Sequence, residues 1–455
     1  MTANATTLAY KFPEHVRHVL SVLEATGHRA YVVGGAVRDL LLGRVPHDWD
    51  VATSATPGRV VDLFPKAVLT GEDFGTVTVL VAGEPVEVTT FRADGCYTDG
   101  RRPDSVVYAR TIEADLSRRD FTVNAMAVDL RGEIVDPFGG RLDLLARCIR
   151  CVGNPAERFA EDHLRMLRAV RLAAELGFRI DKATQEAIVS NSRLIARVSP
   201  ERVRAELDRL LVADQPGDWL NTQALLCLLQ PIIPELLENV GVEQNVYHRY
   251  TVWEHLLRTV DVVPAVLHLR LAALFHDIAK RRTLTETETG RHFYSHEVMG
   301  AEMTRDIMRR LRYPTALTDQ VCNLVRHHMA LVGREKRSDA SLRRLARRAG
   351  VENLADLVTL WRADTKATGR YAVAWTKAEQ DLADRVLSLT VEPPVVKEAG
   401  LAVTGHDVLA AGVPQGPEVG KVLAALLEEV LDEPDRNDRD YLLSRIAEMV
   451  KGVGT

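Results

Sequence analysis

Residues 31–39 read Tyr-Val-Val-Gly-Gly-Ala-Val-Arg-Asp, and this stretch decides how the first part of the chain folds. The β-branched run predicts a strand, the glycine pair a turn, and the residues after it the start of a helix. Backbone N–H groups at Gly34 and Gly35 can approach a phosphate without a Cβ in the way, and Arg38 adds a fork of donors. Most such turns are only structural, because glycine is the ordinary residue of tight connections.

Three carboxylates downstream give the turn a chemical context. Asp48 and Asp50 enter a short β-like stretch, and alternate residues of a strand share a face, so the two can hold one or two Mg²⁺ ions. Glu87 lies within the β-forming run 86–91, where a buried acid needs a partner or a metal. A lone Asp-x-Asp is usually only a solvated face. With the glycine turn, the three carboxylates predict a site for two-metal phosphoryl transfer.

The hydrophobic pattern divides the chain into an α/β part and a helical part. A period of 3.6 residues begins at Pro155, where Asn154 can cap a single long helix that ends before Gly177. Strands are expected at residues 31–33, 50–52, 76–81, 86–91, 106–108 and 125–129. Loops are expected at residues 215–217, 231–234, 283–291, 391–394 and 413–416.

Composition limits the classes of function. The chain has 455 residues, a formal net charge of -5 and 5 cysteines. A polyanionic partner must therefore be met by a local basic patch rather than by the field of the whole protein. No apolar run reaches the ~20 residues of a membrane span. The first ten residues show no secretion signal, and the few cysteines suit a reducing cytoplasm. The sequence does not indicate an oligomeric state.

Five stretches, two of them already described, are specific in their combined order and spacing. They cover residues 34–39, 48–50, 118–125, 136–140 and 161–165. In these motifs the chain resembles the class II tRNA nucleotidyltransferases and bacterial poly(A) polymerases of the polymerase-β-like superfamily, over about residues 31–181. The resemblance implies an α+β fold: a nucleotidyltransferase head (1–152) with a small mixed sheet, an all-α neck for nucleobase selection and RNA binding (153–240), an HD-type metal domain (241–370) and a helical tail (371–455).

The resemblance also implies residue roles in the head. Asp48 and Asp50 correspond to the metal-binding pair, Glu87 to the assisting acid, and Arg119 with Asp120 to the pair that holds the ribose and phosphates of the incoming nucleotide. Taken alone, residues 118–120 would be a surface ion cluster. The nucleotide pocket is expected to extend to about Arg168.

Base selection can be argued from chemistry. Asp162 and Arg165 are three residues apart on the expected helix, which puts them on one face. A carboxylate accepts from an exocyclic amine while a guanidinium donates to the adjacent ring nitrogen, and cytosine and adenine both present that pattern. The pair would therefore admit CTP and ATP and reject GTP and UTP. An ordinary helical salt bridge is the alternative.

Histidines concentrate in the second half of the chain, where eight of the 14 lie between His248 and His328. An adjacent His-Asp at the end of an apolar run is costly unless a metal or partner compensates it. The ordered series resembles HD-superfamily metal phosphohydrolases, and in HD-bearing tRNA nucleotidyltransferases this domain resembles a 2',3'-cyclic phosphodiesterase and phosphatase. The metal motif of residues 48–50 together with residues 52–57, however, looks more like that of members without this hydrolase activity. The expected ligands of a divalent transition metal are His255, His276, Asp277, His296, His327 and Asp364.

Three weaker signals remain. Residues 92–103 resemble the loop motif of members that add complete CCA rather than CC, or form a solvated connection. Residues 334–348 carry seven Lys and Arg, either a patch for RNA phosphates or a solvated helix face. Residues 426–440 are acidic and would repel RNA.

The sequence thus predicts a template-independent enzyme that adds CCA to tRNA from CTP and ATP with Mg²⁺. The alternatives are a poly(A) polymerase, an HD phosphohydrolase with a regulatory nucleotide-binding head, and an RNA-binding protein whose head no longer catalyses. The joint presence of Asp48, Asp50 and Glu87 disfavours the last of these.

Overall fold

The computed structural model describes residues 11–71, 75–93, 107–288, 290–369, 375–391 and 398–452. They form two compact units, one ending at Pro234 and the other beginning at Glu235. The finer division into four domains stays a prediction. No helix in the described ranges combines the length and apolarity that crossing a membrane requires.

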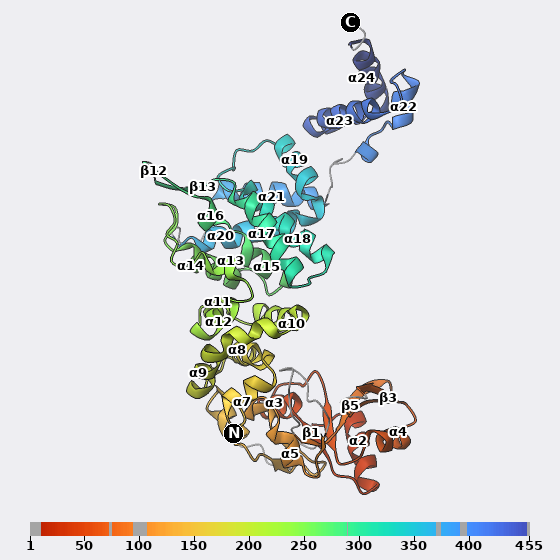
Figure 1. Ribbon diagram of the computed structural model, residues 1–455. Coiled ribbons are helices and arrows are strands. Elements are labelled where there is room, and N and C mark those ends of the chain that lie inside the picture. The colour runs from red at the N-terminus through yellow and green to blue at the C-terminus, as the bar shows by residue number, and fades with distance from the viewer. Residues whose placement is uncertain are drawn as a thin grey trace. The chain divides into compact units, whose positions relative to one another are not determined.

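A seven-stranded mixed sheet forms the centre of the first unit (Figure 1). β2 (Asp50–Thr53) runs parallel to β5 (Glu84–Thr90) and antiparallel to β1 (Ala30–Val33). This register places Asp50 directly beside Glu87. The other strands of the sheet are β3 (Ala67–Gly71), β4 (Thr76–Val81), β8 (Ala127–Val128) and β9 (Ile134–Val135), in the order β3-β4-β5-β2-β1-β8-β9. Two short pairs lie outside it: β6 (Arg92–Ala93) with β7 (Val107–Tyr108), and β10 (Cys148–Ile149) with β11 (Arg179–Ile180).

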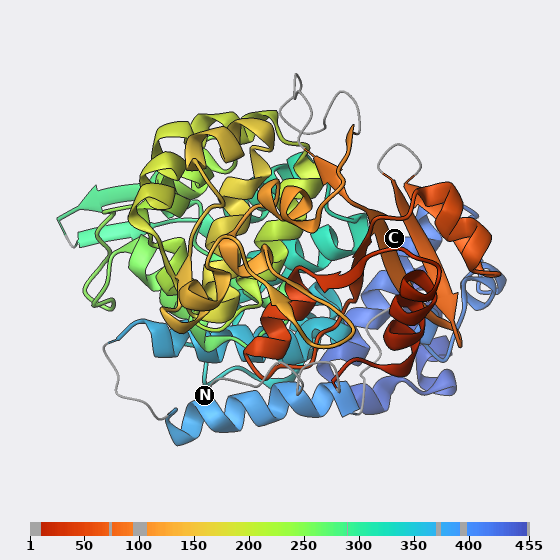
Figure 2. The ribbon, with the colours of Figure 1, turned by 90° about the horizontal axis from the view of Figure 1, so that it is seen from below.

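Helices cover this sheet. α2 (Glu14–Ala25) packs on β1, β4 and β5 (Figure 2) and buries Val16, Val19, Leu20 and Leu23, the spacing of one helical face. α3 (Gly35–Leu41) follows β1 directly, so the strand, turn and helix expected from residues 31–39 are confirmed. The remaining helices of this part are α4 (Pro57–Leu63), α5 (Ile112–Ser117), η2 (Thr122–Asn124) and α6 (Gly140–Leu145).

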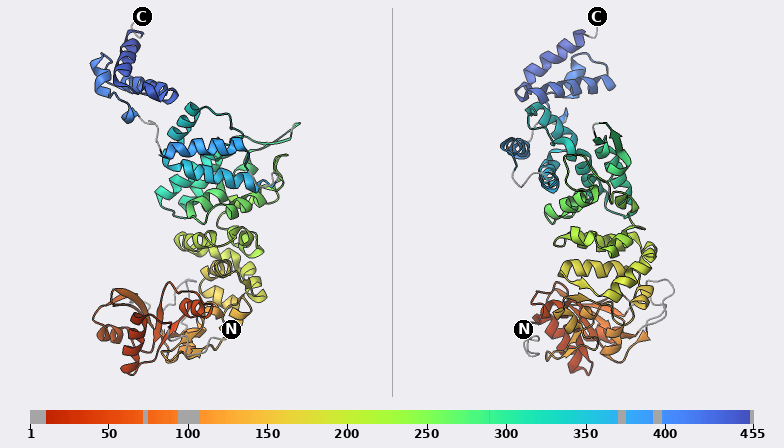
Figure 3. Two further views of the ribbon diagram at one scale, coloured as in Figure 1. Left: turned by 180° about the vertical axis from the view of Figure 1, so that it is seen from behind. Right: turned by 90° about the vertical axis from the view of Figure 1, so that its left-hand side faces the viewer.

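The next helices of the first unit pack against one another in layers (Figure 3). The single helix expected from residue 155 is wrong: α7 (Pro155–Glu161) and α8 (Leu164–Leu176) are separated at Asp162, whose backbone is extended. Asn154 caps α7 and Gly177 ends α8, as expected. The layers are completed by α9 (Lys182–Asn191), η3 (Ser192–Arg197), α10 (Pro200–Leu211), α11 (Pro216–Leu220) and α12 (Gln223–Leu229).

Helices make up most of the second unit. The expected loop at residues 283–291 instead forms the hairpin of β12 (Leu284–Thr287) and β13 (Gly290–Phe293). The helices, after α13 (Pro234–Leu237) at the division, are α14 (Val252–Val262), α15 (Leu267–Phe275), α16 (Lys280–Thr283), α17 (His296–Arg310), α18 (Thr315–His327), η4 (His328–Ala330), α19 (Asp339–Ala349), η5 (Val351–Asn353), α20 (Leu354–Ala367), α21 (Lys377–Val391), η6 (Glu398–Gly400), α22 (Gly405–Ala410), α23 (Pro417–Asp432), η7 (Pro434–Arg436) and α24 (Arg439–Gly452).

Candidate functional site

The glycine turn lies against the first carboxylate of the sheet. Gly34 has a φ of 75°, which favours glycine, and a Cβ there would lie 3.0 Å from Nη1 of Arg119 and 3.6 Å from Oδ2 of Asp50. The glycine therefore lets an arginine and a carboxylate approach the turn together. Arg38 does not present a free fork, because its guanidinium donates to Asp39 at 2.9 and 3.0 Å and to Asn124 at 2.8 Å.

Asp48, Asp50 and Glu87 are close enough to influence one another. Burial raises the pKa of Asp50 most, Arg119 lowers it and Asp48 raises it; desolvation, Asp50 and Asp48 raise the pKa of Glu87. Such mutual repulsion is typical of a cation site. Two expectations fail in detail. β2 begins at Asp50, so Asp48 lies before the strand, and Glu87 is exposed because it points away from the packed face of β5.

A buried carboxylate that sequence reasoning missed holds two arginines of the site. Asp115 is fully buried in α5; one of its oxygens accepts from Arg118 at 2.9 Å and from the Arg92 amide at 3.1 Å, and the other accepts from Arg119 at 3.2 Å. Burial opposes its ionisation, but Arg118 and Arg119 hold the pKa of Asp115 below its ordinary value. The spacing of three and four residues on a helix was the available signal.

Asp120 is tied into the same site. Its Oδ1 accepts from the Phe121 amide at 2.8 Å and from Asn124 at 3.2 Å, while Oδ2 pairs with Arg168 at 2.6 Å. Although burial opposes ionisation, Arg168 and Arg165 lower the pKa of Asp120. The carboxylate is therefore a fixed anion that orients Arg168.

Asp162 and Arg165 are both at the site, but they do not pair. The break between α7 and α8 turns Asp162 toward Arg202, at 2.7 Å, and toward the Leu164 amide, at 3.1 Å. Arg165 pairs with Glu161 at 2.6 Å. The expected shared helix face is wrong because the helix is interrupted between the two residues. The role in base selection stays a prediction.

These side chains line one cavity of about 400 Å³, called the nucleotide cavity below. Asp48, Gly34, Gly35 and Arg38 do not line it among the described residues. Buried Nε of Arg119 has no hydrogen-bond partner in the described ranges, so a donor remains for a ligand. The charged lining residues are Asp50, Glu87, Arg92, Arg118, Arg119, Asp120, Asp162, Arg165, Arg168 and Arg202.

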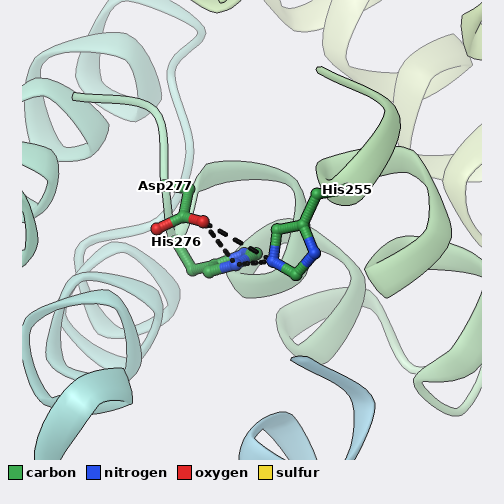
Figure 4. A group of neighbouring side chains, drawn as sticks. All are labelled: His255, His276 and Asp277. Carbon is green, nitrogen blue, oxygen red and sulfur yellow. Dashed lines mark hydrogen bonds and ion pairs between the residues drawn. The ribbon is translucent and has the colours of Figure 1, made fainter. Parts of the chain in front are cut away.

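A second site lies in the second unit and is largely buried. His255 from α14 and His276 and Asp277 after α15 point toward one another (Figure 4). Nε2 of His276 lies 3.1 Å from Nε2 of His255 and 3.2 Å from Oδ2 of Asp277. Asp364, from α20, brings Oδ1 to 3.0 Å from Nε2 of His255.

The other oxygen of Asp277 faces two more histidines. Nε2 of His296 lies 3.2 Å and Nε2 of His328 lies 3.5 Å from Oδ1. These six residues are called the histidine cluster below. His327 is not a member of either group of ligand atoms formed by the described residues; it lies at the end of α18, and the expectation for it is wrong because the chain turns into η4 and directs His328 inward.

The hydrogen bonds of three of these rings leave Nε2 directed toward Asp277. In three of the four rings Nδ1 donates to the carbonyl three residues earlier: His276 to Ala273 at 2.8 Å, His296 to Phe293 at 2.7 Å, and His328 to Val325 at 2.7 Å. When such a ring is neutral, this bond leaves its Nε2 as an acceptor, and Oδ1 of Asp277 has no hydrogen-bond partner among the described residues. Carboxylate and imidazole lone pairs that converge in this way are the ligands of a metal whose outer contacts fix the tautomer.

A buried lysine adds positive charge to the histidine cluster. Nζ of Lys280 lies 2.6 Å from Oδ2 of Asp277 and 2.6 Å from Oε1 of Gln244. Burial opposes ionisation of Asp277, but Lys280 and His276 hold its pKa well below the ordinary value. Lys280 compensates the charge at Oδ2 of Asp277. Oδ1 of Asp277 and the carboxylate of Asp364 remain for further cations.

The basic stretch 334–348 is divided between two environments. Arg344 pairs with Glu428 and Asp432, both at 2.8 Å, and Arg347 pairs with Glu428 at 2.8 Å. The acidic segment of α23 therefore neutralises part of α19. Of the expected loop 92–103, residues 94–103 lie outside the described residues.

Three family models match parts of this chain. A family model described as the poly A polymerase head domain matches residues 30–150, one described as a probable RNA and SrmB-binding site of polymerase A matches residues 177–239, and one described as an HD domain matches residues 245–387. The CCA-adding enzyme of Geobacillus stearothermophilus is 35% identical over 431 residues, which cover 94% of this chain and 95% of that protein. The chain belongs to the CCA-adding enzyme family.

A further relative and a solved structure from this family also match the chain along most of its length. The CCA-adding enzyme of Lactobacillus helveticus is 33% identical over 93% of this chain and 94% of its own length. The crystal structure of the Bacillus stearothermophilus CCA-adding enzyme in complex with CTP matches with a TM-score of 0.72 and 31% identity, covering 97% of this chain and 98% of that chain. The expected α+β fold, with its head and following helices, is thereby confirmed.

Proposed function

We propose that this protein adds CCA to the 3' end of tRNA, without a template, from CTP and ATP. The observation that carries the proposal is the nucleotide cavity, in which carboxylates from adjacent strands face a set of arginines, in a chain that matches CCA-adding enzymes over nearly its whole length. Carboxylate oxygens are the ligands that Mg²⁺ prefers, which supports Asp48 and Asp50 as the metal-binding pair, with Glu87 as the assisting acid.

The arginines supply the charge that a triphosphate requires. Six arginines line the nucleotide cavity, and Asp115 fixes two of them, Arg118 and Arg119, from behind. Arg119 also has an unpartnered buried donor beside the Gly34 turn. A guanidinium group that is already fixed before the nucleotide arrives loses little side-chain freedom when it binds phosphate oxygens. This arrangement supports a triphosphate position between the turn and α5.

In the proposed reaction the 3' hydroxyl of the tRNA attacks the α-phosphorus of the nucleotide. An O–P bond forms, the bond from the α-phosphorus to the bridging oxygen of the β-phosphate breaks, and pyrophosphate leaves with that electron pair. The proton of the hydroxyl passes to a carboxylate, and Glu87, exposed beside Asp50, is accessible for this step. When bound, Mg²⁺ would activate the hydroxyl and offset charge on the pyrophosphate.

Base choice would depend on Asp162 and Arg165 at the same cavity. In the structure each already has a charged neighbour, Arg202 for Asp162 and Glu161 for Arg165. A cytosine or adenine that offers an amine and a ring acceptor can replace part of these contacts, whereas uracil and guanine present a carbonyl and an N–H in the same places.

The test uses a tRNA transcript that lacks its last three nucleotides, with each labelled nucleotide alone and with CTP and ATP together. We expect two residues from CTP alone and a tail that stops after CCA with both. An open-ended adenosine tail on any RNA would instead identify a poly(A) polymerase. No incorporation with Mg²⁺ present would refute the proposal.

The histidine cluster supports a second activity, hydrolysis of a 2',3'-cyclic phosphate at a divalent transition metal. Asp277 directs one oxygen toward His255 and His276 and the other toward His296 and His328, a donor set of imidazole and carboxylate that suits such metals. Hydrolysis of 2',3'-cyclic AMP with Mn²⁺, Co²⁺ or Ni²⁺, and its loss with EDTA, tests this activity. A metal-loaded protein that leaves the substrate intact would refute it.

A further inference from the structure

Two uncharged polar side chains line the nucleotide cavity beside its carboxylates and arginines. They belong to Thr76 on β4 and Thr89 on β5, and both residues are partly exposed. Their hydroxyl oxygens lie 3.1 Å apart, so one hydroxyl donates to the other. Among the described residues neither hydroxyl has a further hydrogen-bond partner. The pair therefore keeps one O–H donor and several lone pairs for a ligand.

Threonines that face away from the cavity differ from this pair. Thr90, next to Thr89 on β5, is buried, and its hydroxyl donates to the Ala55 carbonyl at 2.7 Å. Thr53 on β2 is also buried, and its hydroxyl donates to the Arg29 carbonyl at 2.8 Å. The backbone thus satisfies the hydroxyls on the packed face of the sheet, whereas the two hydroxyls at the cavity have only each other.

The sheet places the threonine pair on one side of the metal-binding carboxylates. Neighbouring strands follow the order β4-β5-β2-β1, and the Gly34 turn comes directly after β1. The register pairs Asp50 on β2 with Glu87 on β5. Thr89 lies two residues after Glu87, on the same face of β5, and pairs with Thr76 on β4. Across the sheet, the carboxylates therefore lie between the glycine turn and Thr76.

The direction of the reaction distinguishes the two sides of the carboxylates. In phosphoryl transfer the attacking and leaving oxygens are roughly in line with the phosphorus between them. The triphosphate position proposed above lies between the Gly34 turn and α5, where arginines would receive pyrophosphate. The attacking 3' hydroxyl then arrives from the side of β5 and β4, next to Glu87. This arrangement places the ribose of the tRNA end beside Thr76 and Thr89.

We propose that Thr76 and Thr89 bind the 2'-hydroxyl of the last nucleotide of the tRNA and so select an RNA end as the acceptor. A 2'-hydroxyl both donates and accepts, which matches a pair of hydroxyls. The terminal base changes during successive additions while the ribose does not, so a contact that serves every addition must be made to the ribose. The proposal rests on the proposed function, because an acceptor end is bound here only if the protein extends it.

The experiment compares two acceptors that differ only at the 2' position of their last nucleotide. Both are tRNA transcripts that end in CC and keep the 3' hydroxyl, with the last cytidine either ribo or 2'-deoxy, and kcat/KM is measured for incorporation of labelled AMP from ATP. The wild type should extend the ribo end about tenfold more efficiently, and the double variant Thr76→Val/Thr89→Val should extend the two ends within about threefold of each other. Any change in the intrinsic reactivity of the 3' hydroxyl is the same for both proteins, so comparing their ratios isolates the contact.

The matched control is Thr90→Val, which removes a hydroxyl from the adjacent residue of β5 on the face away from the cavity. This variant should have a lower Tm and the wild-type ratio between the two ends. A second comparison uses CTP and dCTP with a tRNA that lacks its last three nucleotides. The preference for CTP over dCTP should be the same in the wild type and the double variant, because the pair contacts the acceptor ribose and not the incoming one.

Equal acceptor ratios in the wild type and the folded double variant would overturn the proposal and leave the two hydroxyls as partners of each other only. A changed preference for CTP over dCTP with an unchanged acceptor ratio would also overturn it, by assigning the pair to the incoming nucleotide. If the double variant does not fold, Thr89→Val is measured in the same way, with a fall in the acceptor ratio of about threefold or more expected. A ratio unchanged in that folded variant would again overturn the proposal.

The failure of this proposal is distinguishable from the failure of the proposed function. A wild type that extends neither end would refute the proposed function, and the acceptor contact with it. A wild type that adds AMP to both ends, with a ratio that the threonine substitutions leave unchanged, would refute the acceptor contact alone.

Discussion

The substitution Asp115→Asn tests whether Asp115 positions Arg118 and Arg119 for nucleotide binding without taking part in the chemical step. The carboxylate is fully buried, and both arginine side chains it holds are 19% exposed. Breaking a buried ion pair costs about 3–5 kcal/mol, and the partial exposure of Arg118 and Arg119 places this case near about 3 kcal/mol. Because Arg119 would no longer be held beside the glycine turn, we expect KM for CTP and for ATP to rise about tenfold or more, with a smaller change in kcat.

The control is Asp143→Asn. Asp143 is also buried, pairs with Arg150 at 3.2 Å and accepts from Thr122 at 2.6 Å, but does not line the nucleotide cavity. It should lose stability without a change in KM. Steady-state incorporation and urea unfolding measure the two effects. Equal KM values for Asp115→Asn and the wild type, in a folded protein, would refute the positioning role.

The pH dependence gives an independent check on Asp115. Its folded pKa lies below the ordinary value of 3.8, so the ion pairs stabilise the protein fully above that ordinary value and lose their contribution as pH falls through the folded pKa. The difference in unfolding free energy between the wild type and Asp115→Asn should therefore be constant from about pH 5 to 8 and shrink below about pH 4. A difference that vanished at neutral pH would contradict this reasoning.

Three further predictions concern the two sites. Asp50→Asn should abolish incorporation of both CTP and ATP while tRNA binding by anisotropy persists; extension near the wild-type rate would place the metal site elsewhere. Asp162→Ala should raise UTP incorporation relative to CTP, since one base-edge contact is worth ~1–3 kcal/mol, and an unchanged ratio would leave Asp162 as the partner of Arg202 only. His276→Ala should lose bound transition metal, by elemental analysis, and 2',3'-cyclic phosphate hydrolysis while CCA addition continues; proportional loss of both activities would refute two independent sites.

Sequence patterns predicted the features that depend on residues adjacent in the chain. The strand, glycine turn and helix of residues 31–41 follow from β-branched and glycine patterning, and Asp50 and Glu87 each lie in a strand that patterning had identified. Parallel pairing then brings the two acids together. Asp48 escaped the rule because the strand begins two residues after it, a boundary that periodicity alone does not fix.

Tertiary contacts decided the rest. The interruption of the helix at Asp162 is stabilised by Arg202, which lies forty residues further along the chain. The helix signals within residues 155–176 therefore could not reveal it. At the adjacent pair His327 and His328, the change from α18 to η4 selects which ring points inward. Sequence spacing identified the motif but selected His327 instead of its neighbour His328. Consecutive residues of a helix differ by about 100° in direction, so only one of the two rings faces the histidine cluster.

The arginines of α19 show why charge counted along a sequence does not measure an electrostatic field. Buried Leu342, Leu345 and Ala346 fix the orientation of α19, and that orientation turns Arg344 toward Glu428, which is 84 residues away in the chain. The carboxylates of α23, which alone would repel RNA, thereby neutralise part of the positive charge of α19. The positive potential that remains is carried by side chains without such partners, and these, rather than the densest run of arginines, mark where a polyanion can bind.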